Sequence, residues 1–203
     1  MDWKLARKVA YSIFICAVLV ILFGLSANVP AEAAAKLTAA EGAHLRFIRE
    51  EEKLARDIYN VLGEKWDLKI FAKIAESEQR HTDAVRLVIE KYGINDPARA
   101  TLPAVFADKK LQELYATLLA KGGISSLEAL KVGALAEEKD IFDINEAVKE
   151  TNKPDLLDLY AYLKDGSSTH LRGFMAQIRA AGSDYSPQFI SAAEFDKAMK
   201  VSQ

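Results

Sequence analysis

Apolar residues recur every three or four positions along four long segments of the chain, which is the spacing of one face of an α-helix. The first segment runs from about Thr38 to Gly63 and the second from Asp67 to Gly93. The third begins at Ser125 and continues to about Val148, and the fourth runs from Pro154 to Ala181. The pattern therefore predicts four long amphipathic helices.

Start and stop signals flank these segments. Thr38-Ala-Ala-Glu41 and Ser125-Ser-Leu-Glu128 have the spacing of capping boxes, in which a side chain at each end accepts from the other's backbone N–H. Asp67 is expected to cap the second helix, and Gly93 is a suitable residue to follow it. Pro154 fits the first position of the fourth helix. Gly166, inside that helix, predicts close approach of a neighbouring helix or a local distortion.

The segments between and after the long helices complete the picture. Residues 93–107 include Asn95-Asp96-Pro97 and Pro103 and form an irregular crossover long enough to join opposite ends of a bundle. Asp108 should cap a short helix, Lys109 to Ala120, lying across the bundle, and Ser191-Ala-Ala-Glu194 should cap a tail helix, Ala192 to Lys200. The sequence thus predicts an all-α protein: a four-helix bundle of two helix pairs joined by a long crossover, with short accessory helices.

Polar residues interrupt the apolar stripes at similar depths in all four helices. Glu78-x-x-His81 has the i, i+3 spacing that places a carboxylate and an imidazole on one helical face, where both can bind one ion. The acids Glu51 and Glu138 are alternatives to their neighbours on the first and third helices. The candidate metal ligands are Glu52, Glu78, His81, Glu137, Asp140 and His170.

Four acids buried together need compensation, because an unpaired buried ion costs several kcal/mol. Two divalent metal ions would satisfy all four carboxylates. Oxygen and imidazole ligands without sulfur suit iron or manganese, and iron is the first choice. The sequence therefore predicts a dinuclear centre, most simply with two Fe ions and with Mn as the alternative.

The N-terminal segment has the pattern of an export signal. Lys4, Arg7 and Lys8 precede an uncharged apolar run from Val9 to Leu25, and Ala31-Glu32-Ala33 offers a cleavage site. Residues 1–33 are expected to be removed, which leaves residues 34–203, about 170 residues, as one domain. An uncleaved membrane anchor, residues 9–25, is the alternative. Either way the domain is expected outside the cytoplasm, in the periplasm or the extracellular space.

Composition excludes several classes of function. Cys16 is the only cysteine and lies in the apolar run, so disulfides, thiol catalysis and sulfur-ligated clusters are excluded from the domain. The formal charge of −2 becomes −3 without residues 1–33, since three basic and two acidic residues are lost. No basic excess indicates a nucleic-acid partner.

Several motifs resemble a known superfamily. The segment from Glu52 to Tyr59 resembles the first-helix motif of rubrerythrin-type ferritin-like proteins, and Glu78-x-x-His81 resembles their second-helix motif. Ala136-Glu137-Glu138 stands where the third-helix carboxylate is expected. The resemblance covers residues 38–181. The amino-acid sequences of residues 49–57, 137–141 and 166–172 are similar to those of an exported branch of ferritin-like domains without assigned activity.

One departure from that pattern affects the second metal position. The fourth helix of the family reads Glu-x-x-His, whereas this chain has Ser167-x-x-His170. Asp140 is the candidate replacement for the missing carboxylate. Tyr59 lies on the same face as Glu52, so it is expected either near the metals, as a hydrogen-bond donor or radical relay, or as an ordinary core tyrosine.

The resemblance implies a ferroxidase or a peroxide reductase acting on dioxygen or peroxide. A rubrerythrin carries a cysteine-rich electron-donor domain that this chain lacks, so redox activity requires a separate donor. The alternative class is a metal-free structural module at the cell envelope, which binds a protein partner and in which charged His81 and His170 pair with the acids. The oligomeric state, a homodimer included, stays open.

Overall fold

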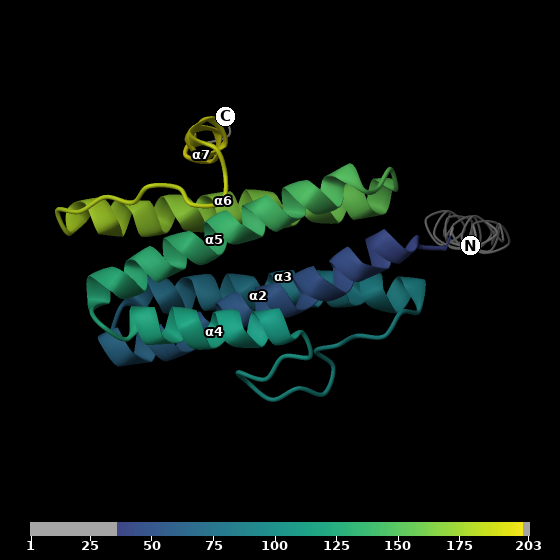
Figure 1. Ribbon diagram of the computed structural model, residues 1–203, viewed down its shortest axis with the longest axis horizontal. Coiled ribbons are helices and arrows are strands. Elements are labelled where there is room, and N and C mark those ends of the chain that lie inside the picture. Colours follow the sequence, from purple (N-terminus) through teal and green to yellow (C-terminus); the bar gives the residue numbers. More distant parts are fainter. Residues whose placement is uncertain (1–35, 201–203) are drawn as a thin grey trace, which may run out of the picture. The chain divides into compact units, whose positions relative to one another are not determined.

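The computed structural model describes residues 36–200, which form six α-helices and no β-strand (Figure 1). The prediction of an all-helical protein is confirmed over this range. The predicted export segment, residues 1–33, and Cys16 lie outside the described residues. None of the described helices is long and apolar enough to cross a membrane. The helices are α2 (Ala39–Trp66), α3 (Lys69–Tyr92), α4 (Lys109–Gly122), α5 (Ser126–Lys149), α6 (Pro154–Ala180) and α7 (Ala192–Ala198).

The four long helices pack as two hairpins. Helix α2 packs most extensively against α3, and α5 against α6, each pair joined by a short loop that makes its helices antiparallel. The hairpins meet through contacts of α2 with α5 and of α3 with α6. Helix α4, which was expected to lie across the bundle, packs outside the four long helices against α2 and α5 (Figure 1). Helix α7 contacts α6.

Most of the predicted helix starts are confirmed. Thr38 and Ser191 form complete capping boxes with Glu41 and Glu194. Ser125 accepts from the backbone N–H of Glu128, and Asp108 caps α4. The predicted glycine after α3, Gly93, has a φ of 64°. These local signals therefore fixed where most helices begin or end.

The junction between α2 and α3 differs from the prediction. Asp67 does not cap α3: it ends α2 in a left-handed conformation with a φ of 49°, and α3 starts after Leu68 without a side-chain cap. Helix α2 also continues through Gly63, its predicted end. A Cβ atom at Gly63 would lie 2.9 Å from the Cβ of Phe71. The glycine is thus required for the close approach of α3, and does not stop α2.

One stretch of α2 is buried on every side. All residues from 48 to 54 are buried, although five of the seven are charged. Arg49 forms a forked ion pair with Asp96, with distances of 3.1 and 3.2 Å. Lys53 binds Asp57 at 2.8 Å and the carbonyl oxygens of Leu102 and Val105. These contacts fix the crossover segment, residues 93–108, against α2.

Apolar residues form two separate clusters along the four helices. One contains Tyr59, Phe71 and Phe174, and the other contains Ile48, Val85 and their neighbours. On α2, α3 and α6, the predicted metal-binding positions fall between residues of one cluster and residues of the other, and on α5 they lie near the end of the first cluster. A polar layer therefore divides the apolar core.

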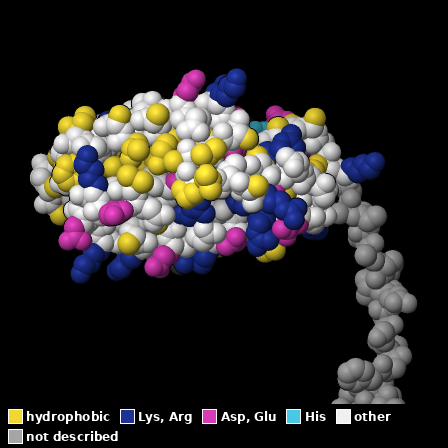
Figure 2. Space-filling view, turned by 90° about the horizontal axis from the view of Figure 1, so that it is seen from below, with side chains coloured by type: hydrophobic (Ala, Val, Ile, Leu, Met, Phe, Trp, Pro, Cys, Tyr) yellow, Lys and Arg dark blue, Asp and Glu magenta, His cyan; other side chains and the backbone are white. Residues whose placement is uncertain are grey.

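The surface carries charges of both signs. Figure 2 shows lysine and arginine interspersed with aspartate and glutamate on one face, where hydrophobic side chains also gather. Mixed charge of this kind is typical of a solvated helical surface.

Candidate metal centre

The polar layer receives side chains from all four long helices. Helix α2 supplies Glu52, α5 supplies Glu137 and Asp140, and α6 supplies His170. Helix α3 supplies Glu78 and His81 from one turn. Each of the six is at most 7 % exposed. The structure therefore brings all six predicted ligands into one buried layer.

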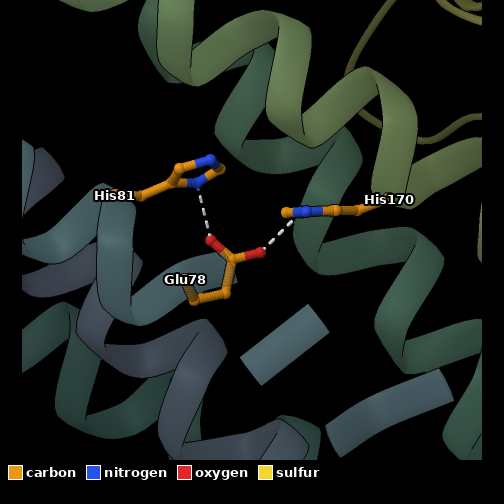
Figure 3. Close-up of side chains that lie close together, drawn as sticks. All are labelled: Glu78, His81 and His170. Atoms are coloured by element: carbon orange, nitrogen blue, oxygen red, sulfur yellow. Dashed lines mark hydrogen bonds and ion pairs between the residues drawn. The ribbon is translucent and has the colours of Figure 1, made fainter. Parts of the chain in front are cut away.

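Glu78 lies between the two histidines (Figure 3). Its Oε2 is 2.9 Å from Nδ1 of His81, and its Oε1 is 2.7 Å from Nδ1 of His170. The two imidazole rings stack with centroids 5.4 Å apart. One ligand atom from each of the three residues lies within 4.8 Å of the others, a spacing that a single metal ion can bridge.

The acids of α2 and α5 complete the arrangement. Glu52 Oε2 is 3.2 Å from Nδ1 of His81, and Glu137 Oε2 is 3.3 Å from Nδ1 of His170. The hydroxyl of Tyr59 donates to Glu137 Oε1 at 2.5 Å. Tyr59 therefore orients a candidate ligand, and its ring packs among Phe71 and Phe174 as an ordinary core tyrosine would.

Asp140 faces the layer and meets the serine that departs from the family pattern. The Ser167 hydroxyl donates to Asp140 Oδ2, so α6 positions this carboxylate where its own carboxylate is missing. Ser167 is 1 % exposed. The pairing supports the expectation that Asp140 replaces the absent fourth-helix acid.

Buried carboxylate oxygens in this layer have no hydrogen-bond donor among the described residues. They include Oε1 of Glu52 and Oδ1 of Asp140. Both residues line a cavity of about 10 Å³ between α2, α4 and α5, close to the smallest volume that holds one water molecule. Oxygens without donors beside a small cavity fit hard or borderline metal cations, whose ligands in proteins are carboxylates and imidazoles.

The ionisation of the layer shows how the side chains compensate one another without metal. Burial and the nearby charge of Glu78 raise the pKa of Glu137 to about 7. Burial also raises the pKa of Glu52 and of Asp140. Burial opposes the charge of Glu78, but hydrogen bonds from His170 and His81 lower its pKa below the ordinary value. Of the four carboxylates in the layer, that of Glu78 thus stays ionised most readily.

The histidines respond in the opposite direction. Burial opposes their protonation, but Glu52 and Glu78 raise the pKa of His81 to about 12. Glu137 and Glu78 raise the pKa of His170 to about 10. Both imidazoles are therefore cationic at neutral pH in the metal-free chain. Nδ1 of His81 lies within hydrogen-bond distance of both Glu52 and Glu78.

Gly166 makes room for one imidazole. A Cβ atom at this position would lie 2.4 Å from Cε1 and Nε2 of His81. The close approach predicted for Gly166 is thus the approach of a candidate ligand.

A family model described as an uncharacterized protein domain, DUF2202, matches residues 41–202. The chain belongs to the DUF2202 family. It is 45% identical over 155 residues to an uncharacterized protein, MJ0754, of Methanocaldococcus jannaschii. The aligned residues make up 76% of this chain and 84% of that relative. The crystal structure of hypothetical protein MJ0754 from Methanococcus jannaschii superposes with a TM-score of 0.80 and 43% identity, and the match covers 83% of this chain and 96% of that one.

In this DUF2202 chain, the two alternative acids have different environments. Glu138 points away from the layer: it accepts hydrogen bonds from the backbone N–H groups of Gln188, Phe189 and Ile190 and from the Tyr185 hydroxyl. Glu51 lines the same cavity as Glu52 and pairs with Lys139. The sequence pattern does not reveal the contact of Lys139 with Glu51 or that of Ser167 with Asp140, since each joins two different helices.

Proposed function

We propose that this DUF2202 chain is an exported ferritin-like protein whose four long helices form a four-helix bundle around a dinuclear metal centre. Iron is the first choice and manganese the second. The observation that supports it best is the meeting of Glu52, Glu78, Glu137, Asp140 and two histidines in one buried layer, with carboxylate oxygens that no described protein group satisfies. Export is proposed from the pattern of residues 1–33.

Charge favours two ions over one. Four ionised carboxylates carry four negative charges, which two divalent cations balance when both histidines are neutral ligands. Without metal, the same layer relies on two imidazolium groups and on protonated acids. The donor set thus fits a pair of divalent ions.

We further propose ferroxidase or peroxide reductase activity. A bound iron pair would supply electrons to dioxygen or peroxide. The protein's own part is to hold the carboxylates, to orient Glu137 through Tyr59, and to exclude bulk water with the two apolar clusters. A reductant must come from another molecule, because Cys16 is the only cysteine in the sequence.

One observation favours a second candidate. His81 and His170 each contact two carboxylates, so two imidazolium groups close a salt-bridge network in the polar layer without a metal. Such a network would suit a structural module that binds a protein partner at the cell envelope.

Elemental analysis separates the two candidates. The full-length chain, without a histidine tag, is loaded anaerobically with Fe(II) and freed of excess metal. We expect about two irons per chain, and none in the Glu78→Ala/His81→Ala variant. The matched control is Arg86→Ala/Glu90→Ala, which removes an exposed pair from the same helix and should keep both irons. One iron per chain would refute the dinuclear centre, and no iron would favour the metal-free module.

A further inference from the structure

The cavity beside the polar layer is lined by both apolar and charged side chains. The apolar ones are Leu54 and Ala55 from α2, Leu114 and Leu118 from α4, and Ala136 from α5. Four acids of the layer, Glu52, Glu78, Glu137 and Asp140, also line it. The remaining lining residues are Glu51 and Lys139, from facing positions on α2 and α5.

Lys139 links this cavity to solvent. Its Nζ is 3.1 Å from Oε1 of Glu51 and also pairs with Asp143 one turn along α5. Its ammonium lies 5.2 Å from the ring centre of Phe47 and 5.8 Å from that of Phe189. The two aromatic rings and two carboxylates thus hold one cation between α2 and α5.

Exposure decreases in steps along these residues. The side chains of Asp143 and Lys139 are each 19% exposed, and that of Glu51 is 6% exposed. Oε2 of Glu51 is buried and has no hydrogen-bond partner among the described residues. Asp143, Glu51 and then the acids of the layer therefore form a series of carboxyl groups from the surface inward.

The histidine side of the layer is more tightly packed. The ring of His81 lies against Gly166 of α6, where even a methyl group would clash. The ring of Tyr162 packs edge-on to His81, with centroids 5.3 Å apart. The imidazole of His81 is therefore enclosed by α6 on that side.

Resting on the function proposed above, we propose that divalent cations reach the centre between α2 and α5 by way of Asp143 and Glu51, and that Lys139 closes this route. The ammonium of Lys139 pairs with Glu51 while no other cation is present. A divalent cation attracted by Asp143 competes for Glu51 because it carries twice the charge of the ammonium. Lys139 then moves aside and the ion passes to the carboxylates of the layer.

Uptake kinetics test the route. Co(II) is mixed with the metal-free full-length chain in a stopped-flow instrument, and its visible absorption reports binding to carboxylate and imidazole ligands. Lys139→Met should speed uptake on the order of tenfold, because it removes a competing and repelling charge. Glu51→Gln should slow uptake by a similar factor. Neither change should alter the number of ions bound at equilibrium.

The control is Lys149→Met, which removes an exposed lysine from the same helix and should leave the rate unchanged. Unchanged rates in both Lys139→Met and Glu51→Gln would overturn the route. A lower final stoichiometry in Glu51→Gln would also overturn it, since Glu51 would then be a permanent ligand. A chain that binds no Co(II) at any concentration would overturn the proposed function itself. If Lys139→Met fails to fold, the rate of Co(II) uptake by Glu51→Gln alone tests the route.

Discussion

Glu50 and Glu52 lie two residues apart on α2 and are equally buried, at 2% exposure each, yet they have different partners. Both oxygens of Glu50 accept backbone N–H groups, from Ala107 at 2.5 Å and Asp108 at 2.9 Å. Glu52 has one oxygen near His81 and one without a donor. Burial alone therefore does not mark a functional acid, whereas the number of donors around it does.

The same contrast recurs on α5. Glu138 receives three backbone N–H groups and a tyrosine hydroxyl, and it holds the segment that precedes α7. Asp140, two residues further along α5, receives a single hydrogen bond, from the hydroxyl of Ser167. The outward acids, Glu50 and Glu138, point away from the polar layer and stabilise connecting segments. The inward acids, such as Glu52 and Asp140, face one another in the layer and need cations.

The largest expected effect is the pH dependence of metal binding. His170 and His81, with pKa values of about 10 and about 12, must each release a proton to ligate a metal. Apparent affinity should rise about tenfold per pH unit for each proton released. Competition with a chelator between pH 6 and 8 measures it. A pH-independent affinity would show that the histidines are not ligands.

The metal-free chain should show the opposite trend in stability. Raised pKa values favour the folded state at low pH: the contribution of Glu137 is present below 4.5 and lost as pH rises through about 7. That of His170 is present below 6.5 and lost through about 10. Thermal unfolding in a chelator should therefore give a Tm that falls from about pH 5 to 10.

Next in size is the loss of an outward acid. Glu138→Ala leaves three backbone N–H groups without an acceptor and should lower the free energy of unfolding by about 3 kcal/mol, with metal stoichiometry unchanged. Asp140→Asn is the inward counterpart. It should leave the metal-free stability nearly unchanged and weaken metal binding. Chemical denaturation and elemental analysis measure both, and the division fails if the two variants behave alike.

A smaller effect is expected at Gly166. Gly166→Ala should displace the imidazole of His81 and lower metal affinity on the order of tenfold. Gly173→Ala, on the same helix, provides the control because its new methyl group would meet only Ile70, at 3.4 Å. That variant should keep its affinity and gain about 0.5–1 kcal/mol from helix propensity. Isothermal titration of both variants compares them, and equal affinities would contradict the role of Gly166.

The smallest effect concerns Tyr59. Tyr59→Phe removes the hydrogen bond to Glu137 but keeps the ring, and should cost about 1 kcal/mol in stability. Both metal ions should be retained, because Tyr59 is not a ligand. Loss of one ion would instead place the hydroxyl among the direct contacts of the metal.

Local signals in the sequence predicted the helices well, because caps and apolar spacing act over a few residues. The junction at Asp67 escaped prediction: Asp67 ends α2 in a left-handed conformation, and Gly63 serves the close approach of Phe71. Five of the six inward residues could be chosen because each falls in an apolar stripe, and Asp140 because it stands one turn after Glu137. Their neighbours could not be sorted the same way: residues 48–54 are buried on all sides, so periodicity no longer separates Glu50 from Glu52.

The candidate ligands come from both hairpins, and this division affects how long the chain stays folded. Hairpin α2–α3 supplies Glu52, Glu78 and His81, and hairpin α5–α6 supplies the other three candidate ligands. Contacts within a hairpin are local and form early, whereas the two hairpins dock only after a long loop has closed. Ions that bridge them would be bound in the native state and absent from the docking barrier, so they should slow unfolding more than they speed folding. The concentration of metal ions available where the chain folds would then set how slowly the folded chain unfolds.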